Sequence, residues 1–186
     1  MERDAVSAGV SQIGGLFSVS QIRILICYLL SSIDEPIPGR QLADMLHYEG
    51  IANCFEVNDS IAVLEKDGHI KCVDNDEYTF VITPKGRDIS DTLKTSLPIA
   101  VKNRAYEFAL KMVSRYKHAK ETDIKISREG SKTYITCSAL DGTDAPFMSA
   151  KLAVSDTGQA EFIKNKFIDD PATIYSEIIK LLTGKK

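Results

Sequence analysis

Hydrophobic residues in the first part of the chain recur at spacings of three and four, which is typical of amphipathic helices. Residues 20–33 follow this pattern, with Ser20 as the expected N-cap and two prolines shortly after the last apolar residue. A second, shorter helix is predicted for residues 40–49. Asn53 and Glu56 have the spacing of a capping box and begin a third helix that ends near residue 67. The pattern therefore predicts three consecutive helices.

The next segment changes from helical to strand-like periodicity. Residues 70–73 and 78–82 are two short apolar stretches separated by four polar residues, as in a β-hairpin. Thr83 and Pro84 then have the chemistry of an N-cap and a first helical position. The order helix, helix, helix, hairpin, helix is that of a winged helix, in which the third helix can enter a DNA groove and the hairpin forms the wing.

The second half of the chain begins with a long helix from Leu97-Pro98 to about Lys117, apolar over a wide face. Alternating patterns at residues 124–127, 132–140 and 146–154 predict an antiparallel meander of three strands. Two further helices are expected, one capped by Asp156 and one begun by Asp170-Pro171.

These elements give an α+β chain with four parts. We predict an N-terminal extension (1–18), a winged helix-turn-helix domain (19–96), a connecting helix (97–120), and a small C-terminal α+β domain (121–186) with a three-stranded antiparallel sheet and two helices. The longest apolar run, residues 24–30, is too short to cross a membrane, and the first residues lack the pattern of a signal peptide. A soluble, cytoplasmic protein without membrane contact is expected.

Several stretches of the chain resemble a known family. Residues 21–30, 50–58 and 174–182 are similar to a bacterial family of winged-helix proteins with no assigned function, and the resemblance covers nearly the whole chain. The run Val81-Ile-Thr-Pro-Lys-Gly-Arg87 resembles the strand-to-helix "L-T-x-x-G-R" signature of many winged-helix transcription regulators, including the multidrug-resistance and phenolic-acid repressor types. The resemblance implies a transcription-regulator-like fold and brings no catalytic or ligand residue with it.

Charge bears directly on DNA binding, because affinity for DNA depends largely on Lys and Arg at phosphates. Residues 18–96 hold seven basic and thirteen acidic side chains, a net charge of −6. A helical wheel places mostly acidic and apolar side chains on the outer face of the third helix: Phe55, Glu56, Asp59, Ala62, Val63 and Lys66. Phe55, Asp59, Ala62 and Val63 are therefore candidates for contact with a protein partner.

The long helix has the opposite charge. It carries Lys102, Arg104, Lys111, Arg115, Lys117 and Lys120 against a single Glu107. Three interpretations stay open: a solvated face, a face toward the acidic winged helix of the same or a partner subunit, or a grip on phosphates beside the wing. The third gives the candidate DNA contacts Lys66, Lys71, Lys85, Arg87, Lys102, Arg104, Lys111 and Arg115.

The sequence offers little for catalysis. It has no nucleophile elbow and no Gly-rich phosphate loop, and Asp141, Asp144 and Asp156 fit turn and cap positions better than a catalytic pair. The four cysteines lie far apart and the histidines lack paired spacing, so we expect reduced core thiols and no metal. Neither an enzyme nor a cofactor is predicted, and no small-molecule effector is assigned.

The first hypothesis from the sequence is a transcriptional regulator that binds duplex DNA and forms a homodimer through its long helix and C-terminal domain. The alternative is a winged-helix module for protein–protein interaction that does not bind DNA. The fold and the signature favour the first hypothesis, and the acidic, partly apolar third helix favours the second.

Overall fold

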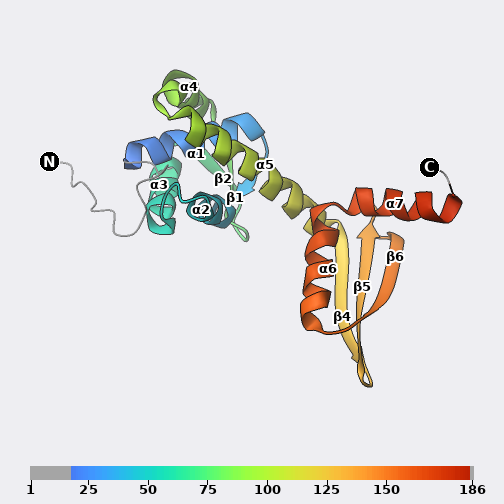
Figure 1. The fold of residues 1–186 in the computed structure, drawn as a ribbon. Helices are drawn as coiled ribbons and strands as arrows, with labels where there is room; N and C mark the ends of the chain where they lie inside the picture. Colours follow the sequence, from blue (N-terminus) through green and yellow to red (C-terminus); the bar gives the residue numbers. More distant parts are fainter. Residues whose placement is uncertain (1–17, 185–186) are drawn as a thin grey trace. The chain divides into compact units, whose positions relative to one another are not determined.

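The computed structural model describes residues 18–184, so the predicted N-terminal extension lies outside the described residues except for Ser18. Within this range the chain is α+β, with seven α-helices and two three-stranded antiparallel sheets (Figure 1). It divides between Met112 and Val113 into two compact units. We describe the first unit (18–112) and the second unit (113–184) separately.

The first unit contains four helices and a small sheet, followed by most of a fifth helix. Its elements are α1 (Val19–Ile33), β1 (Ile37–Pro38), α2 (Gly39–Tyr48), α3 (Cys54–Lys66), β2 (Ile70–Asp74), β3 (Thr79–Ile82), α4 (Pro84–Leu93), a 3-10 turn (Lys94–Ser96) and α5 (Ile99–Lys120). The boundary between the units falls inside α5.

Side-chain caps set the helix starts. The prediction of Ser20 as the cap of α1 is wrong: the hydroxyl of Ser18 accepts the backbone N–H of Gln21 at 3.2 Å, so the cap lies two residues earlier and the helix begins at Val19. The prediction for α3 is confirmed, because the Asn53 side chain accepts the N–H of Glu56 at 2.9 Å. At the end of α1, Asp34 takes the left-handed conformation with φ 56°.

The core of the first unit is centred on α1. Five of the six residues from Leu25 to Leu30 are buried on this helix, the exception being Tyr28, and Ile22 is buried as well. Helices α3 and α4 both pack against α1, and α2 packs against α3. A helix buried over so much of its circumference lies inside its unit rather than on it.

The sheet of the first unit has the strand order β1-β3-β2. The hairpin of β2 and β3 was predicted, whereas β1 was not; its two residues pair with Phe80 and Thr79. The register of β2 against β3 shifts between Cys72 and Asp74, so Val73 is the extra residue of a β-bulge. In the turn, a carboxylate oxygen of Asp74 accepts the N–H groups of Asp76 and Glu77.

The second unit follows the predicted order of three strands and two helices. These are β4 (Thr122–Glu129), β5 (Lys132–Leu140), β6 (Pro146–Val154), α6 (Thr157–Asp169) and α7 (Pro171–Thr183), with the strand order β4-β5-β6. Helix α6 packs on one face of this sheet, above the buried Ile135, Cys137 and Ala139 of β5. Its own Ala160 and Phe167 complete the core.

Two aspartates organise the helices of the second unit, as the sequence predicted. The carboxylate of Asp156 accepts the N–H of Gln159 at 2.8 Å and begins α6. Asp170 accepts the N–H of Thr173 at 3.0 Å and begins α7, and the same residue is the C-cap of α6. A single residue is therefore both the C-cap of α6 and the N-cap of α7.

Candidate functional site

The third helix presents one face to the core and the opposite face to solvent. Val57, Ile61 and Leu64 are buried between α3 and its neighbours. The exposed side chains form what we call the α3 outer face: Phe55, Asn58, Asp59, Ala62, Glu65 and Lys66. Of the outward positions expected from the helical wheel, Glu56 and Val63 are half-buried, and the others are exposed.

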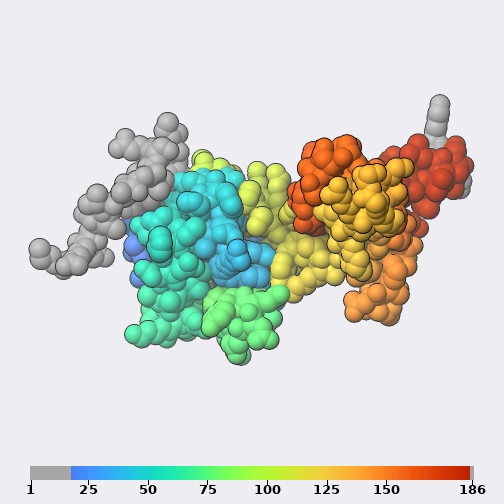
Figure 2. Space-filling view, turned by 90° about the horizontal axis from the view of Figure 1, so that it is seen from below, coloured from blue at the N-terminus to red at the C-terminus, as the bar shows by residue number. Residues whose placement is uncertain are grey.

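Phe55 is the most notable residue of this face, because 83% of its surface is exposed. It lies in the first turn of α3, two residues after the cap residue Asn53. The surfaces of α3 and of the β2–β3 hairpin lie next to each other on an open face of the first unit (Figure 2). A large apolar side chain held this far into water contributes nothing to the core and is available to a partner.

Three further exposed apolar residues near the ends of these elements were missed by sequence reasoning. Tyr48 ends α2 with 77% of its surface exposed, while Val73 and Tyr78 lie in the hairpin and are exposed as well. The signal for Tyr48 was its position beyond the last buried residue of α2, Leu46. The signal for Val73 was strand alternation, which places it on the same side as the exposed Lys71 and opposite the buried Ile70.

Negative charge dominates the same region. From Cys54 to Ile82 the chain holds seven acidic side chains and two basic ones, Lys66 and Lys71. Asp59 and Glu65 lie on the α3 outer face, and Asp74, Asp76 and Glu77 lie in the hairpin turn. Phosphate groups would meet net repulsion across this surface, whereas a cationic protein surface would meet attraction.

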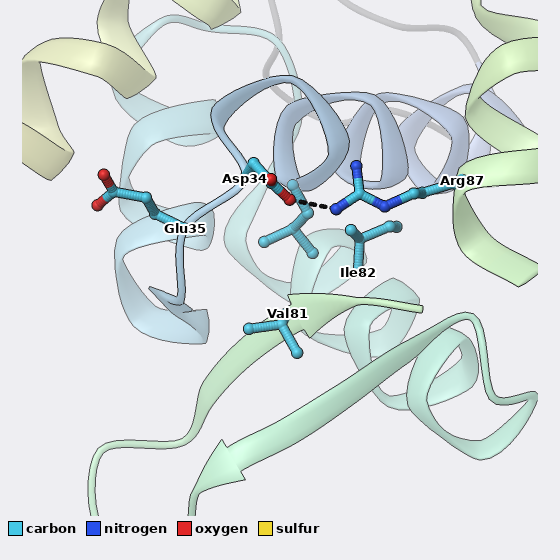
Figure 3. Close-up of a pocket in the computed structure, with 6 residues that line it drawn as sticks. Asp34, Glu35, Val81, Ile82 and Arg87 are labelled. Carbon is cyan, nitrogen blue, oxygen red and sulfur yellow. Dashed lines mark hydrogen bonds and ion pairs between the residues drawn. The ribbon is translucent and has the colours of Figure 1, made fainter. Parts of the chain in front are cut away.

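Two of the cations predicted to hold phosphates beside the wing, Lys85 and Arg87, bind other groups of the chain itself. The ammonium group of Lys85 donates to the backbone carbonyl of Asp67 at 2.8 Å. The guanidinium of Arg87 forms an ion pair with the carboxylate of Asp34 and donates to the carbonyl of Ser31 at 3.5 Å. Figure 3 shows Arg87 and Asp34 pointing toward each other. Both residues line a small hollow of about 210 Å³. The predicted DNA contacts at these two positions thus have structural partners.

The remainder of the strand-to-helix signature has the same structural role. The hydroxyl of Thr83 donates to the carbonyls of Gly68 and His69 at 2.8 and 2.9 Å and accepts the N–H of Gly86 at 3.2 Å. Gly86 is so close to this loop that an added Cβ would lie 2.1 Å from the carbonyl oxygen of His69. Together with Lys85 and Arg87 these residues form the 83–87 clamp, which ties the start of α4 to the α3–β2 turn and to the end of α1.

Two cations on the N-terminal part of α5 also have partners in the first unit. The Lys102 ammonium lies 5.5 Å from the ring centroid of Tyr28. Arg104 forms an ion pair with Glu49, 3.3 Å between Nε and the carboxylate oxygen. These contacts favour the interpretation in which part of the basic helix faces the acidic domain of the same chain.

The later part of α5 belongs to the second unit. Arg115 pairs with Asp169 and donates to the side-chain oxygen of Asn165 at 2.6 Å. His118 Nδ1 lies 3.0 Å from the carbonyl oxygen of Ile168. Of the eight predicted DNA contacts, Lys66, Lys71 and Lys111 have no ionic, hydrogen-bond or aromatic partner among residues 18–184.

The shifted pKa values of titratable groups elsewhere in the chain have structural causes. Burial raises the pKa of the Cys27 thiol to about 11 and also raises the pKa of Cys137. The side-chain hydrogen bond from Thr143 lowers the pKa of Asp141, which closes the β5–β6 turn. The N–H of Gln159 lowers the pKa of Asp156 at the start of α6. Within the described part of the chain, no group of three or more His, Cys, Asp or Glu side chains has the arrangement of a metal site.

Comparison with known proteins identifies the family to which the chain belongs. Among the described residues, no helix is long and apolar enough to cross a membrane. No curated protein and no solved structure matches the chain. A family model described as a domain of unknown function (DUF4364) matches residues 22–182, which is nearly all of both units. The chain therefore belongs to this family.

Proposed function

We propose that the first unit is a winged-helix module that binds a protein partner through the α3 outer face. The order of three helices, a hairpin and a fourth helix supports the winged-helix assignment, as does the antiparallel pairing of β1 with the hairpin strand β3. In this assignment α3 is the recognition helix and the turn between β2 and β3 is the tip of the wing.

The exposure of Phe55 is the observation that carries the proposal. Interfaces between proteins gain most of their affinity from a few buried anchors, and an exposed aromatic side chain on a rigid helix suits that role. The buried Val57, Ile61 and Leu64 fix the helix, so Phe55 is presented without ordering cost for the backbone. Asp59 lies one turn further along the same face of α3, and Glu65 adds negative charge near the end of the helix. The expected partner has an apolar pocket bordered by Lys or Arg side chains.

Binding of duplex DNA by the same helix is the second candidate. Lys66 and Lys71 are exposed and have no partner among the described residues, so both are available to phosphates. Two cations among seven carboxylates supply a weak electrostatic basis, since each phosphate contact contributes through the release of counterions. The two candidates therefore predict opposite sets of sensitive residues.

The test uses the full chain with substitutions that separate these sets. Proteins captured from the source cell's lysate are compared for wild type, Phe55→Ser and Asp59→Lys, with Phe162→Ser as the matched control, since Phe162 is an exposed phenylalanine in the second unit. A partner bound by wild type and by Phe162→Ser is then purified. Its affinity for Phe55→Ser should fall about 30-fold, the loss typical of a hot-spot residue.

Duplex DNA is titrated in parallel at low salt, with wild type and the double variant Lys66→Glu, Lys71→Glu. We expect no more affinity than that of an acidic control protein. If wild type bound duplex DNA, and the lysine variant abolished binding while Phe55→Ser left it intact, the DNA hypothesis would replace the proposal.

A further inference from the structure

The sheet of the second unit has two edges that differ in protection. Proteins guard exposed strand edges with charged side chains, because unpaired backbone groups otherwise invite another strand. The β4 edge carries Asp123, Lys125, Arg128 and Glu129 within eight residues. The β6 edge has nine residues and a single charged one, Lys151, and its proline stands at the first position, where it interrupts nothing.

The single charge on β6 does not guard this edge. The Lys151 ammonium forms an ion pair with Glu129 of β4, 2.5 Å from its carboxylate oxygen. On the way it passes over the ring of Tyr134 on β5, 4.7 Å from the ring centroid. The side chain therefore extends back across the sheet, away from the open side of β6. A strand arriving at this edge would meet a surface without net charge.

The sequence of β6 is complementary to itself in an antiparallel register. With Ala150 at the centre, Met148 of one copy lies opposite Leu152 of the other, and Lys151 lies opposite Ser149 rather than another lysine. Met148 and Leu152 pair with Ala139 and Ile135 of β5, so they lie on the face that α6 covers. Leu152 is 48% exposed in the single chain and would be covered by Met148 of the second copy.

Helix α7 extends the same surface. The ring of Tyr175 contacts Phe147 at the start of β6 in an edge-on arrangement, with 5.4 Å between centroids. Beyond this contact the helix continues past β6 (Figures 1 and 2), where Leu181 and Leu182 are 82% and 80% exposed. In an antiparallel pair, the end of the second copy's β6 lies beside Phe147 and so beside this overhanging part of α7.

We propose that two copies of the chain associate through β6, forming a continuous six-stranded antiparallel sheet with α7 of each copy covering the other. The self-complementary register and the neutral edge favour a second copy over a charged peptide. A stable dimer buries about 800 Å² per partner. A strand pair supplies only part of that area, and the exposed leucines of α7 supply more. This inference does not rest on the proposed binding of a protein partner by α3.

The test compares the two sheet edges in the full chain. Leu152 and Ile126 flank the same residue, Ile135, on the same face, but on β6 and β4 respectively, and are 48% and 37% exposed. Sedimentation equilibrium of wild type should give twice the chain mass of 20.5 kDa. Leu152→Lys should raise the dimer dissociation constant about 30-fold, as loss of an interface anchor does. Ile126→Lys should leave it unchanged.

Hydrogen exchange gives a second, independent readout. Amides of β6 and α7 should be protected at high protein concentration and lose that protection on dilution or in Leu152→Lys, while amides of β4 should not change. A wild-type protein that stays monomeric at tens of micromolar would overturn the proposal. A dimer whose concentration-dependent protection maps to β4, or one equally weakened by Ile126→Lys, would overturn it as well.

Discussion

Replacement of Gly86 by alanine tests the 83–87 clamp most directly. The added Cβ would lie 2.1 Å from the carbonyl oxygen of His69, whereas ordinary contacts between such atoms are 3.4–4 Å. The obstacle is backbone, so no side chain can rotate away. The α3–β2 turn must move by an ångström or more, and that carbonyl also accepts hydrogen bonds from the Thr83 hydroxyl and backbone N–H.

The magnitude follows from three contributions. Overpacking costs about 1 to 3 kcal/mol. Weakening the two hydrogen bonds of Thr83 costs about 1 kcal/mol for each bond that is lost. Alanine is favoured over glycine inside a helix by about 1 kcal/mol, which offsets part of the loss. With one of the two bonds lost, the net destabilisation is about 2 kcal/mol, and for a unit of this size Tm should fall by about 8 to 16 °C.

The matched control is Gly142→Ala, because a Cβ at Gly142 meets no atom within 4 Å and the residue has no positive φ. Thermal unfolding is followed by circular dichroism, and hydrogen exchange assigns the loss of stability to one unit. Amides of α1, α3 and α4 should exchange faster than in wild type in Gly86→Ala, whereas their exchange rates should be unchanged in Gly142→Ala. Equal unfolding temperatures for Gly86→Ala and wild type would refute the structural role of the clamp.

Two predictions concern pH. The pKa of Cys27 is raised by burial from 9.0 to about 11, so the unfolded chain loses this proton first and stability should fall as pH rises from about 9 through about 11, by about 2 to 3 kcal/mol. Urea titrations at pH 8 and 10.5 should show a smaller fall in Cys27→Ala, and equal falls would contradict the assignment. Backbone N–H groups lower the pKa of Asp156 and of Asp170. The two carboxylates therefore stabilise the folded state above about pH 4, and this stabilisation is lost as pH falls through their lowered pKa values. In the double variant Asp156→Asn, Asp170→Asn, the stability of the second unit should fall less as pH is lowered, as measured by hydrogen exchange of α6 and α7. An unchanged fall in stability would assign the acid sensitivity to other groups.

Local chemistry made much of the fold predictable. Asn53, Thr83, Asp156 and Asp170 all cap helices as expected, because a cap depends only on a side chain and an N–H group three residues away. The bounds of β5 and β6 also agree with the prediction. The wrong assignment of Ser20 came from two serines of similar chemistry two residues apart, where periodicity alone does not choose.

Long-range pairing was less accessible from the sequence. Strand β1 has two residues, one of them proline, and exists because Phe80 and Thr79 lie opposite it. The exposure of Phe55, Asp59 and Ala62 on α3 followed from the helical wheel. The partners of the cations did not: Arg87 pairs with Asp34, 53 positions earlier, and no pattern in the sequence connects them. Counting charges thus gave the sign of the surface charge but not which lysines and arginines were available to bind phosphates.

The joint between α6 and α7 has a consequence for how the exposed leucines are displayed. Asp170 ends one helix and begins the next, and Pro171 fixes the backbone at the first helical position. A single non-helical residue separates the two helices, so the direction of α7 relative to α6 depends on the backbone angles of Asp170, φ −156° and ψ 76°. Lengthening the joint by one residue would rotate α7 by about 100° about its axis. The direction in which Leu181 and Leu182 are exposed thus depends on the conformation of one aspartate, eleven residues before Leu181.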